Sequence, residues 1–264
     1  MKEIGIVTIL GCGASAGVPL IGCKCETCTS CSKKNQRLRT SILIELFDKK
    51  VIVDTGPDFR YQMLREKIEK IDGIILTHMH FDHIAGIDDT RPFVFHNKPS
   101  IPIILSQVSY DDFQIKYEYL FKEHHSFTAK VDPIILSQFP KKLSFLDFDW
   151  QFISYYQARM QVLGFRLGNL LYLTDIKDYD DQMLVDLQNI DILIIGALKK
   201  EKTPFHLSID EAIEIGRRLR AKKTYLTHLS HDVNYNIQEK ELPKDVHLAY
   251  DGLKIEFIYE RKTD

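Results

Sequence analysis

The sequence lacks the features that mark several large classes of protein. Its 264 residues contain no apolar run near the ~20 residues that a membrane-spanning helix needs. Lys and Arg (35) nearly balance Asp and Glu (37), so the net charge of −2 creates no overall field that would attract nucleic acid or an anionic membrane. It has no low-complexity segment and no internal repeat at the periods of solenoid proteins. These absences exclude a membrane-spanning or repeat protein and argue against a nucleic-acid partner.

Cysteine is also scarce, and its distribution is uneven. Four of the five cysteines, Cys23, Cys25, Cys28 and Cys31, lie within nine residues. A disulfide framework usually spreads its cysteines along the chain, whereas this close spacing is typical of a metal site. The N-terminal residues 1–13 carry an acidic residue at position 3 and lack the layout of a signal peptide. We therefore expect a cytoplasmic protein with reduced thiols.

Strand-like segments rich in Val, Ile, Leu, Tyr and Phe dominate the chain. The predicted strands are 5–10, 41–46, 50–55, 73–78, 101–105, 152–156, 162–167, 170–175, 191–196, 224–229 and 253–259. The stretch 107–150 gives the weakest signal. No composition shift marks a linker, so we expect a single domain over residues 1–264.

Helical segments lie between several of these strands. Residues 58–71 have apolar side chains at spacings of three and four, and residues 208–219 open with Ser208 followed by Glu211, the signature of a capping box. Two pairs of neighbouring strands resemble antiparallel hairpins, 41–46 with 50–55 and 162–167 with 170–175. This mixture predicts an α/β protein in which two sheets pack together with helices outside.

Polar residues repeatedly follow the apolar strands. Asp54, His78, Asp175 and His228 each come directly after a strand-like run. In α/β architectures, ligands converge at strand ends along one edge of a sheet. We therefore expect these four side chains to meet in one pocket.

The segment "HMHFDH", residues 78–83, concentrates potential metal ligands. His78 and His80 are two apart, so an extended chain turns both imidazoles to one side, and Asp82 and His83 follow where the chain enters a helix. Imidazole and carboxylate bind Zn²⁺ and other divalent ions such as Mn²⁺ or Fe²⁺. Two such ions about 3.5–4 Å apart can activate water and bind both oxygens of a phosphoester. The sequence thus predicts a centre for one or two divalent ions.

The segment "THMHFDH" resembles the signature of the metallo-β-lactamase superfamily, whose αββα four-layer sandwich agrees with the predicted elements. The resemblance implies that His78 and His80 bind a first ion and that Asp82, His83 and His228 bind a second ion. It implies that Asp175 bridges both ions, that Asp54 supports the ligands from behind, and that Asp82 also takes part in catalysis.

Two further segments, "LGCGASAGVPLIGCKCETC" and "THLSH", resemble the phosphoribosyl cyclic phosphate phosphodiesterase branch of that superfamily. The resemblance implies a separate structural Zn²⁺ at a loop of about residues 20–32, with the ligands Cys23, Cys25, Cys28 and His231. On spacing alone, Cys31 is an alternative to His231. His206 aligns with a histidine that the branch uses on its substrate, and an imidazole there could donate a proton to the leaving oxygen.

One ligand of the superfamily pattern is missing. The superfamily supplies another histidine to the first ion, and counting back from Gly164 places that position on Ala158. No histidine lies between His125 and His206, so a small alignment shift does not restore it. The first ion would keep only three ligands and bind more weakly. A natural one-metal enzyme, an altered sequence and a member that has lost catalysis all remain open.

The leading hypothesis is a metal-dependent phosphodiesterase that acts on a small cyclic or diester phosphate through a hydroxide activated by the metal. One alternative is an RNA-processing nuclease of the same superfamily, but the basic substrate arm that this resemblance brings is absent. Another is a catalytically impaired metal-binding protein that resembles the branch linked to pyrroloquinoline quinone synthesis. That branch has a depleted histidine motif, whereas residues 78–83 are complete here. Of partners, we expect the phosphoester substrate, with a homodimer left open and no membrane contact.

Overall fold

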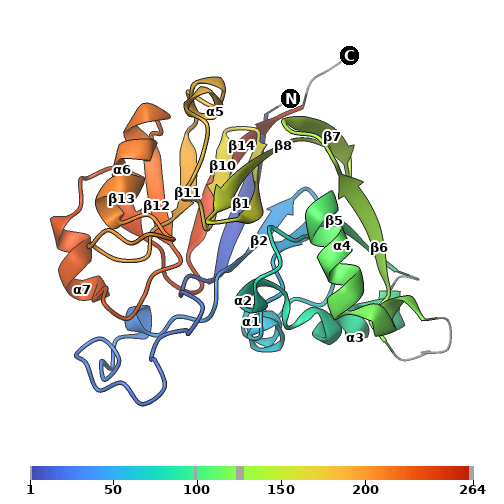
Figure 1. Cartoon of the computed structure of the whole chain (residues 1–264), viewed down its shortest axis with the longest axis horizontal. Helices are drawn as coiled ribbons and strands as arrows, with labels where there is room; N and C mark the ends of the chain where they lie inside the picture. Colours follow the sequence, from blue (N-terminus) through green and yellow to red (C-terminus); the bar gives the residue numbers. More distant parts are fainter. Residues whose placement is uncertain (1, 98–99, 123–127, 262–264) are drawn as a thin grey trace.

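The computed structural model describes residues 2–97, 100–122 and 128–261, in which two β-sheets pack face to face (Figure 1). The first sheet has the order β14-β1-β2-β3-β4-β5-β6, and the second has the order β13-β12-β11-β10-β9-β8-β7. The strands of the first sheet are β1 (Lys2–Gly11), β2 (Ser41–Leu46), β3 (Lys49–Val53), β4 (Gly73–Ile75), β5 (Ile101–Ser106), β6 (Val131–Leu136) and β14 (Lys254–Glu260). Those of the second are β7 (Lys141–Phe145), β8 (Phe148–Gln157), β9 (Met160–Leu167), β10 (Leu170–Leu173), β11 (Ile192–Gly196), β12 (Lys223–Thr227) and β13 (Val246–Leu248).

Helices cover the outer face of each sheet (Figure 1). The outer face of the first sheet carries α1 (Phe59–Glu66), α2 (Phe81–Ile84), α3 (Arg91–Asn97) and α4 (Gln107–Lys116). The second sheet carries α5 (Asp181–Asp186), α6 (Ile209–Arg218) and α7 (Tyr235–Gln238). The layers are therefore helix, sheet, sheet, helix, which confirms the predicted αββα sandwich in a single domain. Within the described ranges, none of these helices has the length and apolarity required to span a bilayer.

The central strands β2 to β5 of the first sheet are buried on both faces, because the second sheet covers one face and the helices cover the other. In β2, Ile42 and Ile44 face the core between the sheets, whereas Leu43 packs under the helices. The second sheet contributes large aromatic side chains to the central core, among them Trp150 and Phe165, whose rings meet edge to face at 5.3 Å. This double burial explains why the strands appear as continuous apolar runs in the sequence.

The predicted hairpins and helices are present. Strands β2 and β3 pair antiparallel, as do β9 and β10. The capping box at α6 forms, because Ser208 accepts from the backbone of Glu211 and the Glu211 side chain accepts in return. Helix α1 is shorter than predicted, since Lys67 turns into the left-handed region and ends it.

Three strands were not predicted: β6, β7 and β13. All three are edge strands of their sheets. Edge strands are commonly short, charged or interrupted by proline, which weakens the apolar pattern. Here β6 contains Pro133, β7 begins with two lysines, and β13 has three residues.

Candidate functional site

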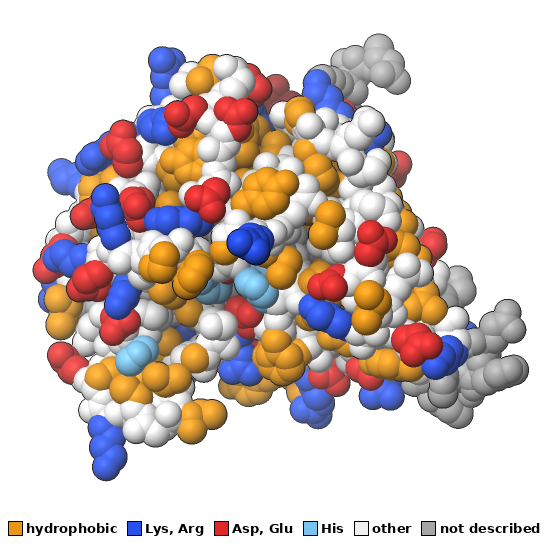
Figure 2. Space-filling view, viewed as in Figure 1, with side chains coloured by type: hydrophobic (Ala, Val, Ile, Leu, Met, Phe, Trp, Pro, Cys, Tyr) orange, Lys and Arg blue, Asp and Glu red, His pale blue; other side chains and the backbone are white. Residues whose placement is uncertain are grey.

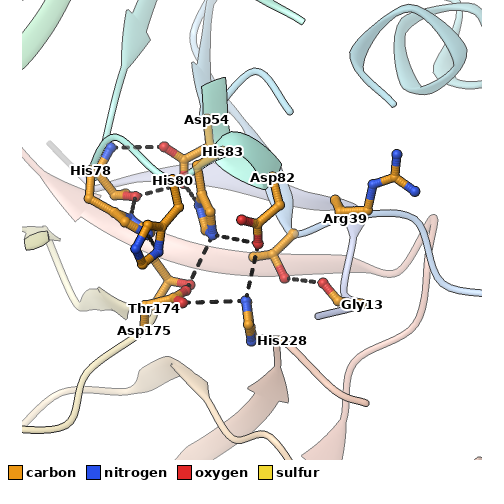
Figure 3. A network of polar contacts seen from close by, with 12 residues as sticks. Gly13, Arg39, Asp54, His78, His80, Asp82, His83, Thr174, Asp175 and His228 are labelled. Carbon is orange, nitrogen blue, oxygen red and sulfur yellow. Dashed lines mark hydrogen bonds and ion pairs between the residues drawn. The ribbon is translucent and has the colours of Figure 1, made fainter. Parts of the chain in front are cut away.

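Three strand ends turn their side chains toward a common point between the sheets (Figure 3). Asp54 follows β3, Asp175 lies two residues beyond β10, and His228 follows β12. All three have left-handed backbones, with φ values of 65°, 50° and 59°. Such strained conformations in non-glycine residues concentrate at functional sites. They turn the chain sharply at or just beyond the end of each strand.

A first group of side chains consists of His78, His80 and Asp175, whose ligand atoms lie within 4.8 Å of one another. Residues 76–80 continue β4 in an irregular segment, and the two imidazoles point to the same side. His78 Nε2 lies 2.9 Å from His80 Nδ1. His78 is fully buried, whereas His80 reaches the surface in part. The first three predicted ligands therefore meet.

A second group consists of Asp82, His83 and His228, again within 4.8 Å. Asp82 Oδ2 lies 3.3 Å from His83 Nε2 and 3.5 Å from His228 Nε2. Asp175 borders this group as well, with its carboxylate oxygens 3.4 Å from His83 Nε2 and 3.3 Å from His228 Nε2. Asp175 thus stands between the two groups, where a bridging ligand would be.

The second group fits a divalent ion better than it fits a hydrogen-bond network. His83 Nε2 and both ring nitrogens of His228 are buried without a hydrogen-bond partner among the described residues. Buried polar atoms normally have partners. Ligand atoms about 2.0–2.1 Å from a tetrahedral zinc lie about 3.3 Å from one another. The contacts of 3.3–3.5 Å between these nitrogens and the carboxylates of Asp82 and Asp175 match that spacing.

The charges of the two carboxyl groups in the cluster suit the binding of a divalent ion. Burial opposes ionisation of Asp82 and Asp175, but His83 and His228 outweigh it and lower the pKa of both carboxyl groups. Burial, reinforced by nearby His83, lowers the pKa of His78 well below its usual value. Metal ligands must be deprotonated. The carboxylates are thus ionised near neutral pH and the His78 ring is neutral. At His83 and His228 burial is outweighed by the nearby carboxylates, which raise the pKa of both rings, so these two ligands release a proton when an ion binds.

Asp54 forms hydrogen bonds with two residues of the segment that carries the histidines. Its Oδ2 accepts a 2.7 Å hydrogen bond from His83 Nδ1, which leaves His83 Nε2 directed at the second group. The backbone N–H and the hydroxyl of Thr77 also donate to Asp54, both at 2.8 Å. A carboxylate behind a histidine fixes the ring orientation and raises its basicity.

Two threonines of this supporting layer were missed by sequence reasoning. Thr77 holds Asp54, and the hydroxyl of Thr174 donates to Asp175 Oδ1 at 2.7 Å. The sequence does contain a signal for them. A Leu-Thr pair precedes His78, Asp175 and His228 alike.

We predict that Asp54→Asn weakens the binding of divalent ions by 10–100-fold, because supporting partners of metal-binding histidines typically contribute that much. The change removes the negative charge that orients His83. Calorimetric titration with Mn²⁺ measures the effect. Asp48→Asn, at an exposed carboxylate between β2 and β3, is the matched control. Unchanged affinity in Asp54→Asn would show that His83 needs no such support.

The residue that lies where the further histidine of the superfamily was expected is not the predicted one. Ala158 is exposed in the β8–β9 turn, with a φ of 52°, and does not reach the cluster. Gln157, the last residue of β8, is only 5% exposed, and its Nε2 lies 3.2 Å from Asp175 Oδ2. The prediction of Ala158 was wrong by one residue. Ile153 pairs with Gly164, the residue from which the position was counted. Because side chains alternate along a strand, residue 157 lies on the same face of β8 as Ile153, and residue 158 does not.

His206 lies at the rim of the cluster, in the loop before α6. Its ring stacks on that of His228, with centroids 4.9 Å apart, and its side chain is 20% exposed. Its Nδ1 is 3.7 Å from Asp175 Oδ2, and His206, Asp175 and His228 also qualify geometrically as an ion-binding set. Burial and the charge of His228 lower the pKa of His206 to about 4. The ring can therefore contact either an ion or a substrate.

The cysteine-rich loop forms a separate cluster, the cysteine group: Cys23, Cys25, Cys28 and His231. The Sγ atoms of Cys23 and Cys25 each lie 3.5 Å from His231 Nδ1. A tetrahedral zinc with sulfur at 2.3 Å and nitrogen at 2.0–2.1 Å places these atoms about 3.5 Å apart. Cys31 is exposed and stands outside the group. The geometry thus favours His231 over Cys31.

The hydrogen bond with His231 lowers the pKa of Cys25 to about 6, which favours the thiolate that binds metal. The chain that flanks the loop is also tied to the segment that contains His231 by Arg37, which pairs with Val18 and whose buried guanidinium donates to the carbonyls of Ser230 and Val233 at 2.9 and 2.6 Å. Because His231 follows His228 by three residues, the loop contacts the segment that carries a predicted active-site ligand.

The sequence matches a known family over most of its length. Residues 49–229, which include both groups of the central cluster, match the family described as Beta-lactamase superfamily domain. The crystal structure of a diphosphatase from the PhnP family is 34% identical, with a TM-score of 0.91 over 98% of this chain and 99% of that one.

More distant relatives share the fold. The metallo-β-lactamase fold protein YhfI from Bacillus subtilis is 21% identical, with a TM-score of 0.74 over 97% of this chain and 100% of that one. Human tRNase Z, short form, is 18% identical, with a TM-score of 0.66 over 95% and 98%. An octanoyltransferase from Porphyromonas gingivalis (strain ATCC BAA-308 / W83) is 31% identical over 250 residues, which cover 93% of this chain and 50% of that protein. This chain therefore spans about half the length of that relative.

The family match, the four-layer sandwich and the close likeness to the diphosphatase agree with one another. The chain therefore belongs to the beta-lactamase superfamily, within the PhnP family of metallo-β-lactamase-fold hydrolases.

Proposed function

We propose that this protein is a metal-dependent hydrolase that cleaves a P–O bond in a small phosphodiester. The observation that carries the proposal is the second group with Asp175, in which buried, unpartnered ring nitrogens lie at ligand spacing from two ionised carboxylates. Divalent ions bound there and by His78 and His80 would activate water and neutralise charge on the phosphoryl oxygens. The metal is Zn²⁺, Mn²⁺ or Fe²⁺, and the cysteine group holds a structural Zn²⁺.

The surrounding side chains take distinct parts in this reaction. His206 lies at the open rim and donates an N–H hydrogen bond to the leaving oxygen. Asp82 orients the attacking water, besides its role as a ligand. Asp54 and Thr77 keep His83 in its orientation through the hydrogen bonds described above.

Two exposed phenylalanines that are sequence neighbours of the cluster favour a substrate with an apolar or aromatic substituent. Phe81, between His80 and Asp82, is 72% exposed, and Phe205, next to His206, is 56% exposed. Figure 2 shows histidine side chains exposed near the middle of this face, among hydrophobic, basic and acidic side chains. Exposed aromatic rings beside a reactive centre can stack on a flat group of the substrate.

A diphosphate is the second candidate substrate, because the 34% identical relative is described as a diphosphatase. Both bonds are cleaved by attack on phosphorus, so the same side chains serve either reaction. The likeness to tRNase Z supports the fold alone, and the net charge of −2 does not favour RNA. The activity of the octanoyltransferase is not proposed here, since this chain matches half of that protein.

Hydrolysis of bis-p-nitrophenyl phosphate, a cyclic phosphodiester and a diphosphate diester distinguishes these candidates. We expect protein treated with a chelator to be inactive and to recover phosphodiester hydrolysis when Mn²⁺ or Zn²⁺ is restored. Hydrolysis of the diphosphate alone would favour the second candidate. A protein that has regained its ions and cleaves none of the three would contradict the proposal.

A further inference from the structure

Gln157 occupies an unusual place for a glutamine. It is 5% exposed, and its amide Nε2 lies 3.2 Å from Asp175 Oδ2. The same nitrogen lies 2.9 Å from Nε2 and 3.2 Å from Nδ1 of His206. The amide therefore connects the carboxylate between the two groups with the imidazole at the rim. Its Oε1 is buried and has no hydrogen-bond partner in the described part of the chain.

The two groups differ in the number of side chains that can bind an ion, and Gln157 stands beside the group that has fewer. The second group combines three side chains with Asp175, so four side chains offer a ligand atom to one ion. The first group has His78, His80 and Asp175, and the side chain next to it is a neutral amide whose N–H faces Asp175. Imidazole nitrogen binds zinc and manganese more strongly than an amide does. The amide turns its Nε2 toward Asp175 and His206, and an amide N–H, unlike an imidazole nitrogen, cannot bind an ion.

We propose that Gln157 is a positioning residue that holds His206 against Asp175, and that it leaves the centre with one tightly held divalent ion instead of two. The proposal rests on the metal centre of the proposed function. In it, the ion at the second group is retained, and an ion at the first group binds far more weakly. His206 owes its place at the rim to the Gln157 amide, together with the hydrogen bonds of Thr203 to its backbone.

Counting bound ions tests the first part. In equilibrium dialysis with Mn²⁺, the wild-type centre should bind one ion at least ~10-fold more tightly than a second. Gln157→His should tighten the second ion by ~10-fold or more and convert the mononuclear Mn²⁺ resonance spectrum into that of a coupled pair. Ala158→His is the matched control, because that residue is exposed in the turn, and it should behave as wild type.

A double-mutant cycle in phosphodiester hydrolysis tests the second part. Gln157→Ala should lower kcat while KM and the tightly bound ion stay unchanged. Adding His206→Ala to Gln157→Ala should cost much less than His206→Ala costs alone, because the two residues act as a unit. Independent, multiplying losses would overturn the positioning role.

The outcomes separate this inference from the proposed function. Two equally tight ions in the wild type, or unchanged Mn²⁺ binding in folded Gln157→His, would overturn the inference and leave a two-metal hydrolase intact. If no variant bound an ion in the centre, whether Mn²⁺, Zn²⁺ or Fe²⁺ was supplied, both would be overturned.

Discussion

Asp175→Asn is expected to lose the tightly held ion and to lower hydrolysis by on the order of 10³-fold. Asp175 borders both groups, at 3.3 and 3.4 Å from the nearest ring nitrogens of the second. Asparagine keeps the size of the side chain but removes its negative charge and replaces one acceptor oxygen by a donor. The loss therefore acts on every ion in the centre at once.

Metal analysis by mass spectrometry and steady-state kinetics measure both effects of Asp175→Asn. Asp178→Asn, at an exposed carboxylate three residues further along, is the matched control and should retain metal and rate. Circular dichroism checks that both variants are folded. A folded Asp175→Asn protein with wild-type metal content and rate would contradict the role given to Asp175.

Cys25→Ser is expected to release the structural zinc and to lower the melting temperature by about 10 °C, equivalent to ~3 kcal/mol of unfolding free energy. Structural zinc contributes folding energy directly, and an ion in the cysteine group would join the loop to His231 after β12. The effect is limited because Arg37 still ties the chain that flanks the loop to Ser230 and Val233.

Cys31→Ser is the control for Cys25→Ser, since Cys31 is exposed and outside the cysteine group. It should keep both zinc and melting temperature. Differential scanning calorimetry and zinc analysis give the two readings. If Cys25→Ser kept its stability but lost turnover, the division between a structural and a catalytic metal would be wrong.

Much of the fold was predictable because its central strands are buried on both faces. Segments such as 41–46 and 191–196 are therefore apolar throughout and stand out in the sequence. The edge strands β6, β7 and β13 were not predicted, since one side of each has no neighbouring strand and their composition is mixed. The three missed strands are thus those whose composition burial does not determine.

The candidate site was predictable to the extent that its chemistry is concentrated in histidine and aspartate at strand ends. His78, Asp175 and His228 were recognisable in this way, and the structure brings them together. Gln157 was missed because glutamine is common on protein surfaces and carries no signal of its own. Its identification needed the β8–β9 register, which decides whether residue 157 or 158 faces the cluster.

Anomalous X-ray diffraction from crystals grown with Mn²⁺ and Zn²⁺, recorded on both sides of each absorption edge, tests the central claim most directly. We predict a strong peak enclosed by Asp82, His83, Asp175 and His228, a weaker or absent one at His78 and His80, and a zinc peak in the cysteine group. A map without anomalous density among the first four side chains would contradict the account.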